Sequence, residues 1–179
     1  ELAYALLEGG VDLLLVETMF DLLSGKAAIA ACHRAMVRHG RVVPIQAQVT
    51  IELTGRMLPG TEIGAAITSL LPVGVDVLGL NCATGPVEMH EPLRTLSDTA
   101  PVPLACLPNA GLPSVVDGQM HYDLTPEALA EHLAQFVDSG IEIRFARKRH
   151  RKVLETLQHI ARAFKSALRQ QRRLQTATR

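Results

Sequence analysis

Short apolar stretches recur along the first 143 residues, and each is followed by a polar loop and then by a helical pattern. Runs that are apolar on both faces suit strands buried in a parallel sheet, and the pieces between them show the spacing of amphipathic helices. The expected strands are 11–16, 42–49, 75–80 and 102–107, with a fifth beginning at 141–143, and the expected helices are 2–8, 22–39, 62–71, 87–99 and 125–139. Alternation at this spacing predicts successive βαβ units, and therefore the α/β class.

Two α/β architectures fit this pattern. One is an open, doubly wound sheet, but none of the strands is followed by a glycine-rich phosphate-binding loop. The other is the later part of a (β/α)8 TIM barrel, which needs roughly 250 residues when complete, so this chain would hold about half of one. Aromatic residues make up only 3% of the chain, so the core must be built from Ala, Leu, Val and Ile. In both architectures the site is expected in the loops that follow the strands.

Charge divides the chain into two parts. Residues 1–143 hold six Lys and Arg against 17 Asp and Glu, a balance of −11, whereas residues 144–179 hold 12 against one, a balance of +11. In the second part apolar residues recur at helical spacing beside the cations, which predicts a basic amphipathic helix. We therefore expect a barrel domain over 1–143 and a basic helical tail over 144–179. The helix could be solvated against the acidic part or could bind an anionic partner.

The chain has three cysteines, in no paired spacing, and this excludes a disulfide scaffold and favours a reducing cytoplasm. No apolar run is long enough for a membrane span, and no signal peptide is recognisable. The first residue is Glu1 and a helical pattern starts at once, so we expect the chain to begin inside a larger protein.

Three residues at predicted strand ends are candidates for function. Cys82 follows the strand 75–80, and the alternative is that it is a small buried hydrophobe. Glu17 follows the strand 11–16, where it could instead cap the next helix, a role that Asp21 could equally fill. Asn109 follows the strand 102–107 and could simply stabilise its own turn. Packing roles are expected for Cys32 and Cys106, and surface positions for His33, His39, His121 and His132.

The loop sequences together resemble the homocysteine-binding (homocysteine S-methyltransferase) domains of cobalamin-dependent methionine synthases. The resemblance rests on Glu17-Thr18 within VDLLLVETMFD, on the stretch 50–60, on GLNCATGP at 79–86 and on PNAGLP at 108–113. These pieces occur in the family's order and extend over residues 1 to about 143. The resemblance implies a TIM barrel, a methyltransferase activity and homocysteine as the substrate.

The resemblance also implies roles for the three candidates. In the family three cysteine thiolates hold zinc, and the one in the GLNC loop is matched by Cys82. Zinc binds the homocysteine sulfur and keeps it deprotonated and nucleophilic. The family's glutamate and asparagine that hold the amino-acid end of homocysteine are matched by Glu17 and Asn109. Methylcobalamin and methyl-tetrahydrofolate belong to other domains of the family, and the cobalamin-binding domain is the expected partner.

The chain departs from the family after residue 143. The family places a Gly-Gly-Cys-Cys run there, which supplies two zinc thiolates, whereas this chain has Arg147 and Lys148 at about those positions. Cationic side chains cannot ligate zinc, so we expect an incomplete site with little affinity for the metal. Residues 144–179 either belong to a divergent protein that has lost catalysis or form a truncated or frame-altered tail.

Three functions are therefore carried forward. The first is the homocysteine-binding part of a methionine synthase, which transfers a methyl group from methylcobalamin to homocysteine. The second is a catalytically inactive barrel fragment whose basic helix binds anionic partners, although nucleic acid is not expected because interleaved aromatic residues are missing. The third is a homocysteine methyltransferase that uses betaine or another small donor. We also expect the isolated chain to associate, because part of a barrel leaves sheet edges unpaired.

Overall fold

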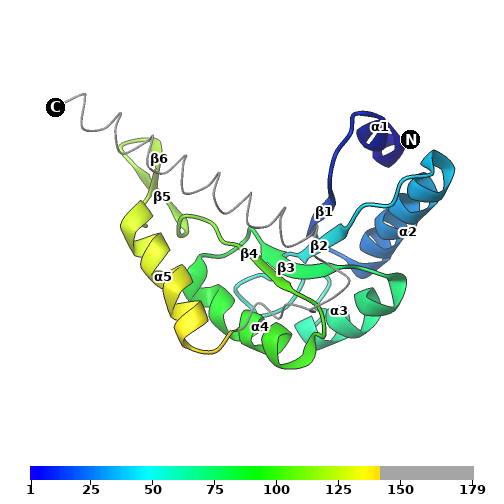
Figure 1. Cartoon of the computed structure of the whole chain (residues 1–179). Helices are drawn as coiled ribbons and strands as arrows, with labels where there is room; N and C mark the ends of the chain where they lie inside the picture. The colour runs from blue at the N-terminus through cyan, green and yellow to red at the C-terminus, as the bar shows by residue number, and fades with distance from the viewer. Residues whose placement is uncertain (142–179) are drawn as a thin grey trace. The chain divides into compact units, whose positions relative to one another are not determined.

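A computed structural model describes residues 1–141 of the chain, and these residues form a mixed α/β structure (Figure 1). Strands β1 to β4 make one parallel sheet in the order β1-β2-β3-β4, so neighbours in sequence are neighbours in space. The strands are β1 (Leu14–Met19), β2 (Ile45–Val49), β3 (Val77–Asn81), β4 (Leu104–Leu107), β5 (Pro113–Val116) and β6 (Gln119–Tyr122). The helices are α1 (Leu2–Glu8), α2 (Leu22–His39), α3 (Ile63–Leu70), α4 (Pro86–Thr99) and α5 (Pro126–Asp138), with a 3-10 turn η1 (Leu71–Val73) after α3. The α/β class and the parallel sheet are thus confirmed.

The main core lies between one face of the sheet and the helices α2, α3 and α4. Alternate residues of β2 and β3 pack there, and they include Ile45, Ala47 and Leu80, which are almost completely buried. Side chains alternate between the two faces of a strand, so the residues between them point to the opposite face. Those residues include polar ones, and the candidate site is built on that second face.

Every strand of the parallel sheet begins two or three residues later than the sequence predicts. Val42 is 87% exposed and Val43 donates its N–H to the sulfur of Met36, so neither extends β2. β2 and β4 each begin directly after a proline, Pro44 and Pro103. Proline has no N–H to donate to a ladder, so it marks the point where regular pairing can start.

The end of β1 also differs from the prediction. The residues 17–19 were expected in a loop, but they belong to β1, because pairing with β2 resumes at Met19 opposite Val49 after a bulge. Glu17 is therefore a strand residue. A bulge re-aims the side chains around it, and it lies here at the carboxyl end of the strand.

The connection between β4 and α5 is not the plain loop that the sequence predicted. It contains the antiparallel hairpin β5–β6, which turns at Asp117 and Gly118 with φ values of 50° and 76°. Two consecutive positive φ values are typical of a type I′ turn, for which Asp-Gly is a strong sequence signal. The Asp-Gly dipeptide is the sequence signal for this hairpin, but the two strands beside it have only four residues each and show no clear alternating pattern.

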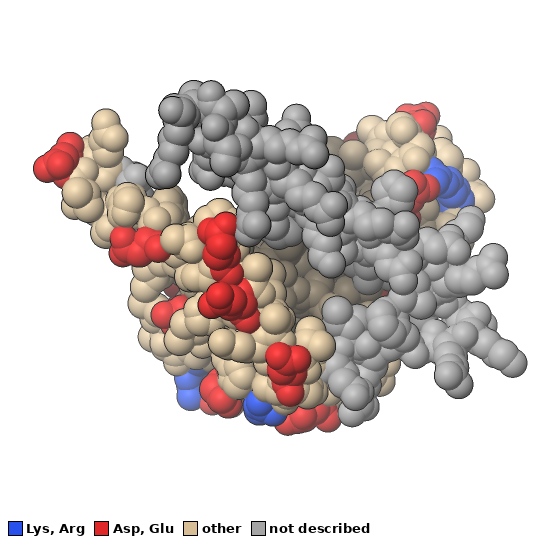
Figure 2. Space-filling model, turned by 60° about the vertical axis from the view of Figure 1, so that its left-hand side comes forward, with Lys and Arg blue, Asp and Glu red and all other residues tan. Residues whose placement is uncertain are grey.

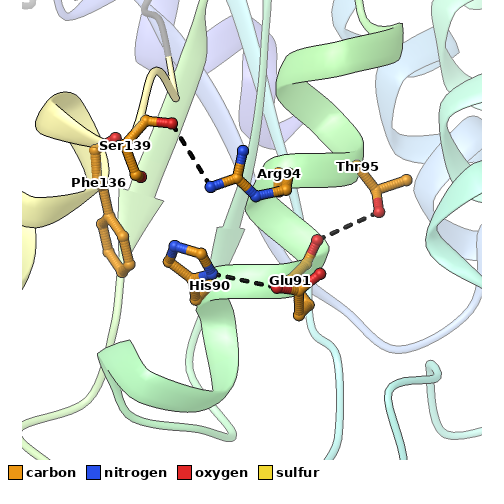
Figure 3. Close-up of polar contacts among 6 residues, drawn as sticks. All are labelled: His90, Glu91, Arg94, Thr95, Phe136 and Ser139. Carbon is orange, nitrogen blue, oxygen red and sulfur yellow. Dashed lines mark hydrogen bonds and ion pairs between the residues drawn. The ribbon is translucent and has the colours of Figure 1, made fainter.

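Helix α5 begins as predicted and packs against α4 (Figure 3). Thr125 caps its first turn by accepting the N–H of Ala128, and Pro126 occupies the first helical position. The ring centroids of His90 on α4 and Phe136 on α5 lie 5.8 Å apart, so the two helices are in contact there. Ile141 belongs to no strand, whereas the rest of the predicted fifth strand and the predicted basic helix lie outside the described residues.

Acidic side chains predominate over basic ones on the surface in view in Figure 2, as the charge balance of residues 1–143 leads one to expect. Among residues 1–141, no helix combines the length and the apolar character that crossing a membrane requires.

Candidate functional site at the carboxyl ends of the strands

The ends of β1 and β3 are joined by the side chain of Asn81, the last residue of β3. Its Oδ1 accepts the backbone N–H of Thr18 at 2.9 Å, and its Nδ2 donates to the Thr18 hydroxyl at 2.8 Å. β2 lies between these strands, and two strand spacings amount to about 9.5 Å in a flat sheet. A contact across β2 therefore requires the sheet to curl toward this face.

Cys82 belongs to the same cluster. Asn81 Nδ2 lies 3.2 Å from Cys82 Sγ, and the Thr18 hydroxyl lies 3.9 Å from it. The thiol is partly exposed, and its neighbours in this network are an amide and a hydroxyl. Cys82 is therefore not a small hydrophobe buried in the core, which was the alternative interpretation. An amide N–H aimed at sulfur stabilises negative charge on it.

The backbone around this cluster adopts left-handed conformations that only glycine adopts without cost. Thr18, Cys82 and Ala83 have φ values of 56°, 59° and 57°. The Thr84 N–H closes a three-residue turn by donating to the Cys82 carbonyl at 2.7 Å. Each such residue costs about 1–3 kcal/mol, and the conformation persists only where the surroundings hold it in place. Asn81 supplies part of that support, and it thereby directs the Cys82 side chain.

Further hydrogen bonds tie neighbouring strand ends to this cluster. Thr50, the residue after β2, donates its hydroxyl to the Asn81 carbonyl at 3.2 Å and its N–H to the Met19 carbonyl at 3.1 Å. Cys82 donates its N–H to the carbonyl of Leu107, the last residue of β4. All four parallel strands therefore end at one connected cluster.

Asn109 lies in the connection after β4 and contacts the loop after β3. Its N–H donates to the Thr84 carbonyl at 3.0 Å, and the backbones of Gly85 and Gly111 pass so close that a Cβ on Gly85 would lie 3.2 Å from Gly111 Cα. Within the described residues the Asn109 side-chain amide has no hydrogen-bond partner, so it does not stabilise its own turn as the alternative supposed. The structure thus brings the loops of Cys82 and Asn109 together.

Glu17 directly precedes Thr18 and is exposed. It does not cap α2, because Asp21 does so by accepting the N–H of Ser24 at 2.8 Å. That same hydrogen bond lowers the pKa of the Asp21 carboxyl. Glu17 is therefore available for another role at the end of β1.

The other two cysteines lie on the helix-covered side, in packing positions as predicted. Cys106 directs its sulfur toward Met89 of α4 at 3.9 Å, and burial raises the pKa of its thiol to about 12. Cys32 is buried on α2, and burial raises the pKa of its thiol also. Neither sulfur is on the face that carries Cys82.

A zinc ion held by three thiolates does not fit this chain. Within residues 1–141, no group of three or more His, Cys, Asp or Glu is arranged to hold a metal. Because the whole chain has three cysteines and two of them lie behind the sheet, Cys82 is its one candidate thiolate at this face. Arg147 and Lys148, at the positions of the expected ligands, lie outside the described residues.

Several residues of this cluster were not recognised in the sequence. Thr18, Asn81 and Thr50 stood inside recognised loop motifs but were given no role, and Gln48 stood inside an apolar strand. A polar residue in a strand that is otherwise apolar was the available signal, since burying a polar group without a hydrogen-bond partner is costly.

Known proteins resemble this chain in sequence and, more weakly, in structure. The sequence family described as homocysteine S-methyltransferase matches residues 1–144. The methionine synthase of Mycobacterium tuberculosis (strain ATCC 25618 / H37Rv) is 54% identical over 137 residues, which are 76% of this chain and 12% of the relative. The methionine synthase of Mycobacterium leprae (strain TN) is 52% identical over 137 residues, 76% of this chain and 11% of the relative. The chain thus spans a small part of these relatives.

The similarity to a solved structure is weaker than the similarity in sequence. One similar structure is that of 2,3-dimethylmalate lyase, a member of the PEP mutase/isocitrate lyase superfamily. The match covers 90% of this chain and 62% of the lyase chain, with a TM-score of 0.43 and 18% sequence identity. Similarity at that level does not establish a shared fold.

Proposed function

The chain belongs to the homocysteine S-methyltransferase family, and we propose that its residues 1–141 provide the homocysteine-binding face of a methionine synthase. The observation that carries the proposal is the Thr18–Asn81–Cys82 cluster at the carboxyl ends of the strands. It combines a directed thiol with costly backbone conformations, and such conformations are concentrated at functional sites.

The reaction is a methyl transfer to sulfur. The homocysteine thiol loses its proton to solvent, and the resulting thiolate attacks the methyl carbon of the donor, so that a sulfur–carbon bond forms as the bond to the donor breaks. We propose that methylcobalamin on another domain would supply the methyl group and would keep the bonding electron pair, and that methyl-tetrahydrofolate would be the source of that methyl group. The relatives' name, methionine synthase, agrees with the product.

The residues of this chain hold and orient the substrate. We propose that the Glu17 carboxylate pairs with the homocysteine ammonium, and that the Asn109 amide donates to or accepts from the amino-acid end. Two observations support this assignment: Glu17 lies at the end of β1, and the Asn109 side-chain amide has no partner among residues 1–141. Cys82 would then lie at the sulfur end. Since the donor set does not fit zinc, no step is assigned to a metal.

We also propose that the four-stranded sheet is part of a (β/α)8 barrel. A doubly wound sheet reverses its strand order at a switch point, whereas this sheet proceeds β1-β2-β3-β4 without reversal. The Asn81 contact across β2 indicates a sheet that curls, as a barrel requires. The division into a barrel domain over 1–143 and a basic tail over 144–179, and a cytoplasmic location, remain part of this proposal.

Isothermal titration calorimetry of the 179-residue chain with L-homocysteine tests the function. We expect saturable binding that weakens by about 10- to 100-fold in Glu17→Gln, because a hydrogen bond to a charged group contributes about 1.5–3 kcal/mol. Glu8→Gln, on the exposed end of α1, is the matched control and should bind normally. If the unsubstituted chain shows no binding heat, the proposed function is wrong for this chain.

A further inference from the structure

Gln48 on β2 is completely buried, and its side chain is unsatisfied. Its exposed fraction is 0%, and neither Nε2 nor Oε1 has a hydrogen-bond partner in the described part of the chain. Most buried polar atoms in folded proteins are hydrogen-bonded, so an amide with both ends unpaired requires an explanation. A ligand that is not part of the chain would supply the missing partners.

The register of the sheet shows where the amide lies. Ala47 and Val49, the neighbours of Gln48 in β2, pack in the core beneath the helices, so Gln48 points to the opposite face. That is the face on which Thr50 contacts Asn81. Gln48 lies two residues before Thr50, close to the carboxyl end of the strand.

The residues beside Gln48 on β3 and β4 have no polar side-chain atom that could pair with the amide. Its partner on β3 is Gly79, and the partner of Gly79 on β4 is Ala105. Glycine and alanine offer neither a donor nor an acceptor in their side chains, so the Gln48 amide stays unpaired on this side. On the other side, Val16 pairs with Ala47 and Met19 with Val49, so the bulge sets two residues of β1, Glu17 and Thr18, against Gln48.

We propose that Gln48 is a substrate-binding residue that holds the amino-acid end of homocysteine together with Glu17. An amide offers donors at Nε2 and an acceptor at Oε1, whereas an amino acid offers a carboxylate that accepts and an ammonium that donates. Nε2 donates to the carboxylate, Oε1 accepts from the ammonium, and the Glu17 carboxylate completes the charge pairing. This inference rests on the proposed function.

The test replaces Gln48 by methionine in the 179-residue chain. Gln48→Met keeps the length of the side chain and removes both hydrogen-bonding ends. Calorimetry with L-homocysteine is expected to show binding weakened by about 10- to 100-fold, since a hydrogen bond to a charged ligand group is lost. Gln46→Met, on the same strand and face but one pleat further from the carboxyl end, is the matched control and should bind within about twofold of the parent.

Thermal unfolding without ligand separates substrate binding from a structural role. An amide that is unsatisfied in the free protein destabilises it, so Gln48→Met should raise the unfolding midpoint by about 2–4 °C. A lowered midpoint together with weaker binding would show that the amide is partnered inside the fold, which overturns the proposal. Unchanged binding by Gln48→Met also overturns it. Absence of binding by the unsubstituted chain defeats the proposed function, and this inference with it.

Discussion

Asn81 is the residue on which the geometry of the site depends most. Its side chain is 2% exposed and makes three contacts, at 2.9 Å to the Thr18 N–H, 2.8 Å to the Thr18 hydroxyl and 3.2 Å to Cys82 Sγ. Leucine has a similar size and shape but offers no polar atom. The substitution Asn81→Leu therefore removes all three contacts while the number and the branching of the side-chain heavy atoms are kept.

The size of the effect follows from these contacts. Each hydrogen bond contributes about 1 kcal/mol net, and a buried N–H left without a partner costs about 1–3 kcal/mol, which here falls on Thr18. The greater hydrophobicity of leucine offsets part of the loss. We expect the free energy of unfolding to fall by about 3 kcal/mol, measured by urea denaturation followed by circular dichroism. Thr68→Val, on the exposed face of α3, is the control and should change it by less than about 0.5 kcal/mol.

A second substitution isolates the contact with sulfur. Asn81→Asp keeps the oxygen that accepts the Thr18 N–H, and the Thr18 hydroxyl can rotate to donate to the new oxygen. Cys82 instead faces a carboxylate, which opposes negative charge on its sulfur. We expect alkylation of Cys82 by iodoacetamide at neutral pH, followed by peptide mass spectrometry, to slow by about tenfold. Unchanged stability in Asn81→Leu, or unchanged alkylation in Asn81→Asp, would refute the view that Asn81 supports and directs this thiol.

Three further predictions concern a buried thiol, the sheet and the metal. Burial raises the pKa of the Cys106 thiol from 9.0 to about 12. Between about pH 9 and 12 this thiol ionises in the unfolded chain but stays protonated in the folded one, so the free energy of unfolding should fall as the pH rises. Cys106→Ala should remove that part of the loss in pH-dependent denaturation. Gly79→Ala drives a Cβ into the Ala105 carbonyl oxygen, so we expect the free energy of unfolding to fall by at least about 1–3 kcal/mol, whereas Gly64→Ala, where nothing lies within 4 Å, should be tolerated. We also expect the purified chain to hold far less than one zinc per chain by atomic emission, and near-stoichiometric zinc would contradict our view of Cys82 as an isolated ligand.

The sequence predicted the helices better than the strands. Helix α2 begins and ends where expected, because Asp21 and Gly40 mark its ends with local signals that act within one turn. Strand ends depend on hydrogen bonds from neighbouring strands, which a single stretch of sequence does not contain. The bulge that carries Glu17 into β1, and the late start of β2, both follow from such pairing.

The candidate site was predicted in part. Loop motifs identified Cys82 and Asn109, and the structure brings their loops into contact through the Thr84 carbonyl. The functional roles of these residues and of Glu17 stay predictions. The support given by Asn81 and the unsatisfied amide of Gln48 were not predicted, because both depend on which residues of other strands lie beside them.

The amino-acid sequence by itself determined the α/β class, the order of the elements and the membership in a methyltransferase family, since hydrophobic periodicity, capping residues and loop motifs are local properties. Only the tertiary structure decided which side of the sheet each polar residue occupies and which cysteine is free to act. A strand alternates its side chains between two faces, and only packing of helices on one of them shows which face is left for Gln48, Asn81 and Cys82.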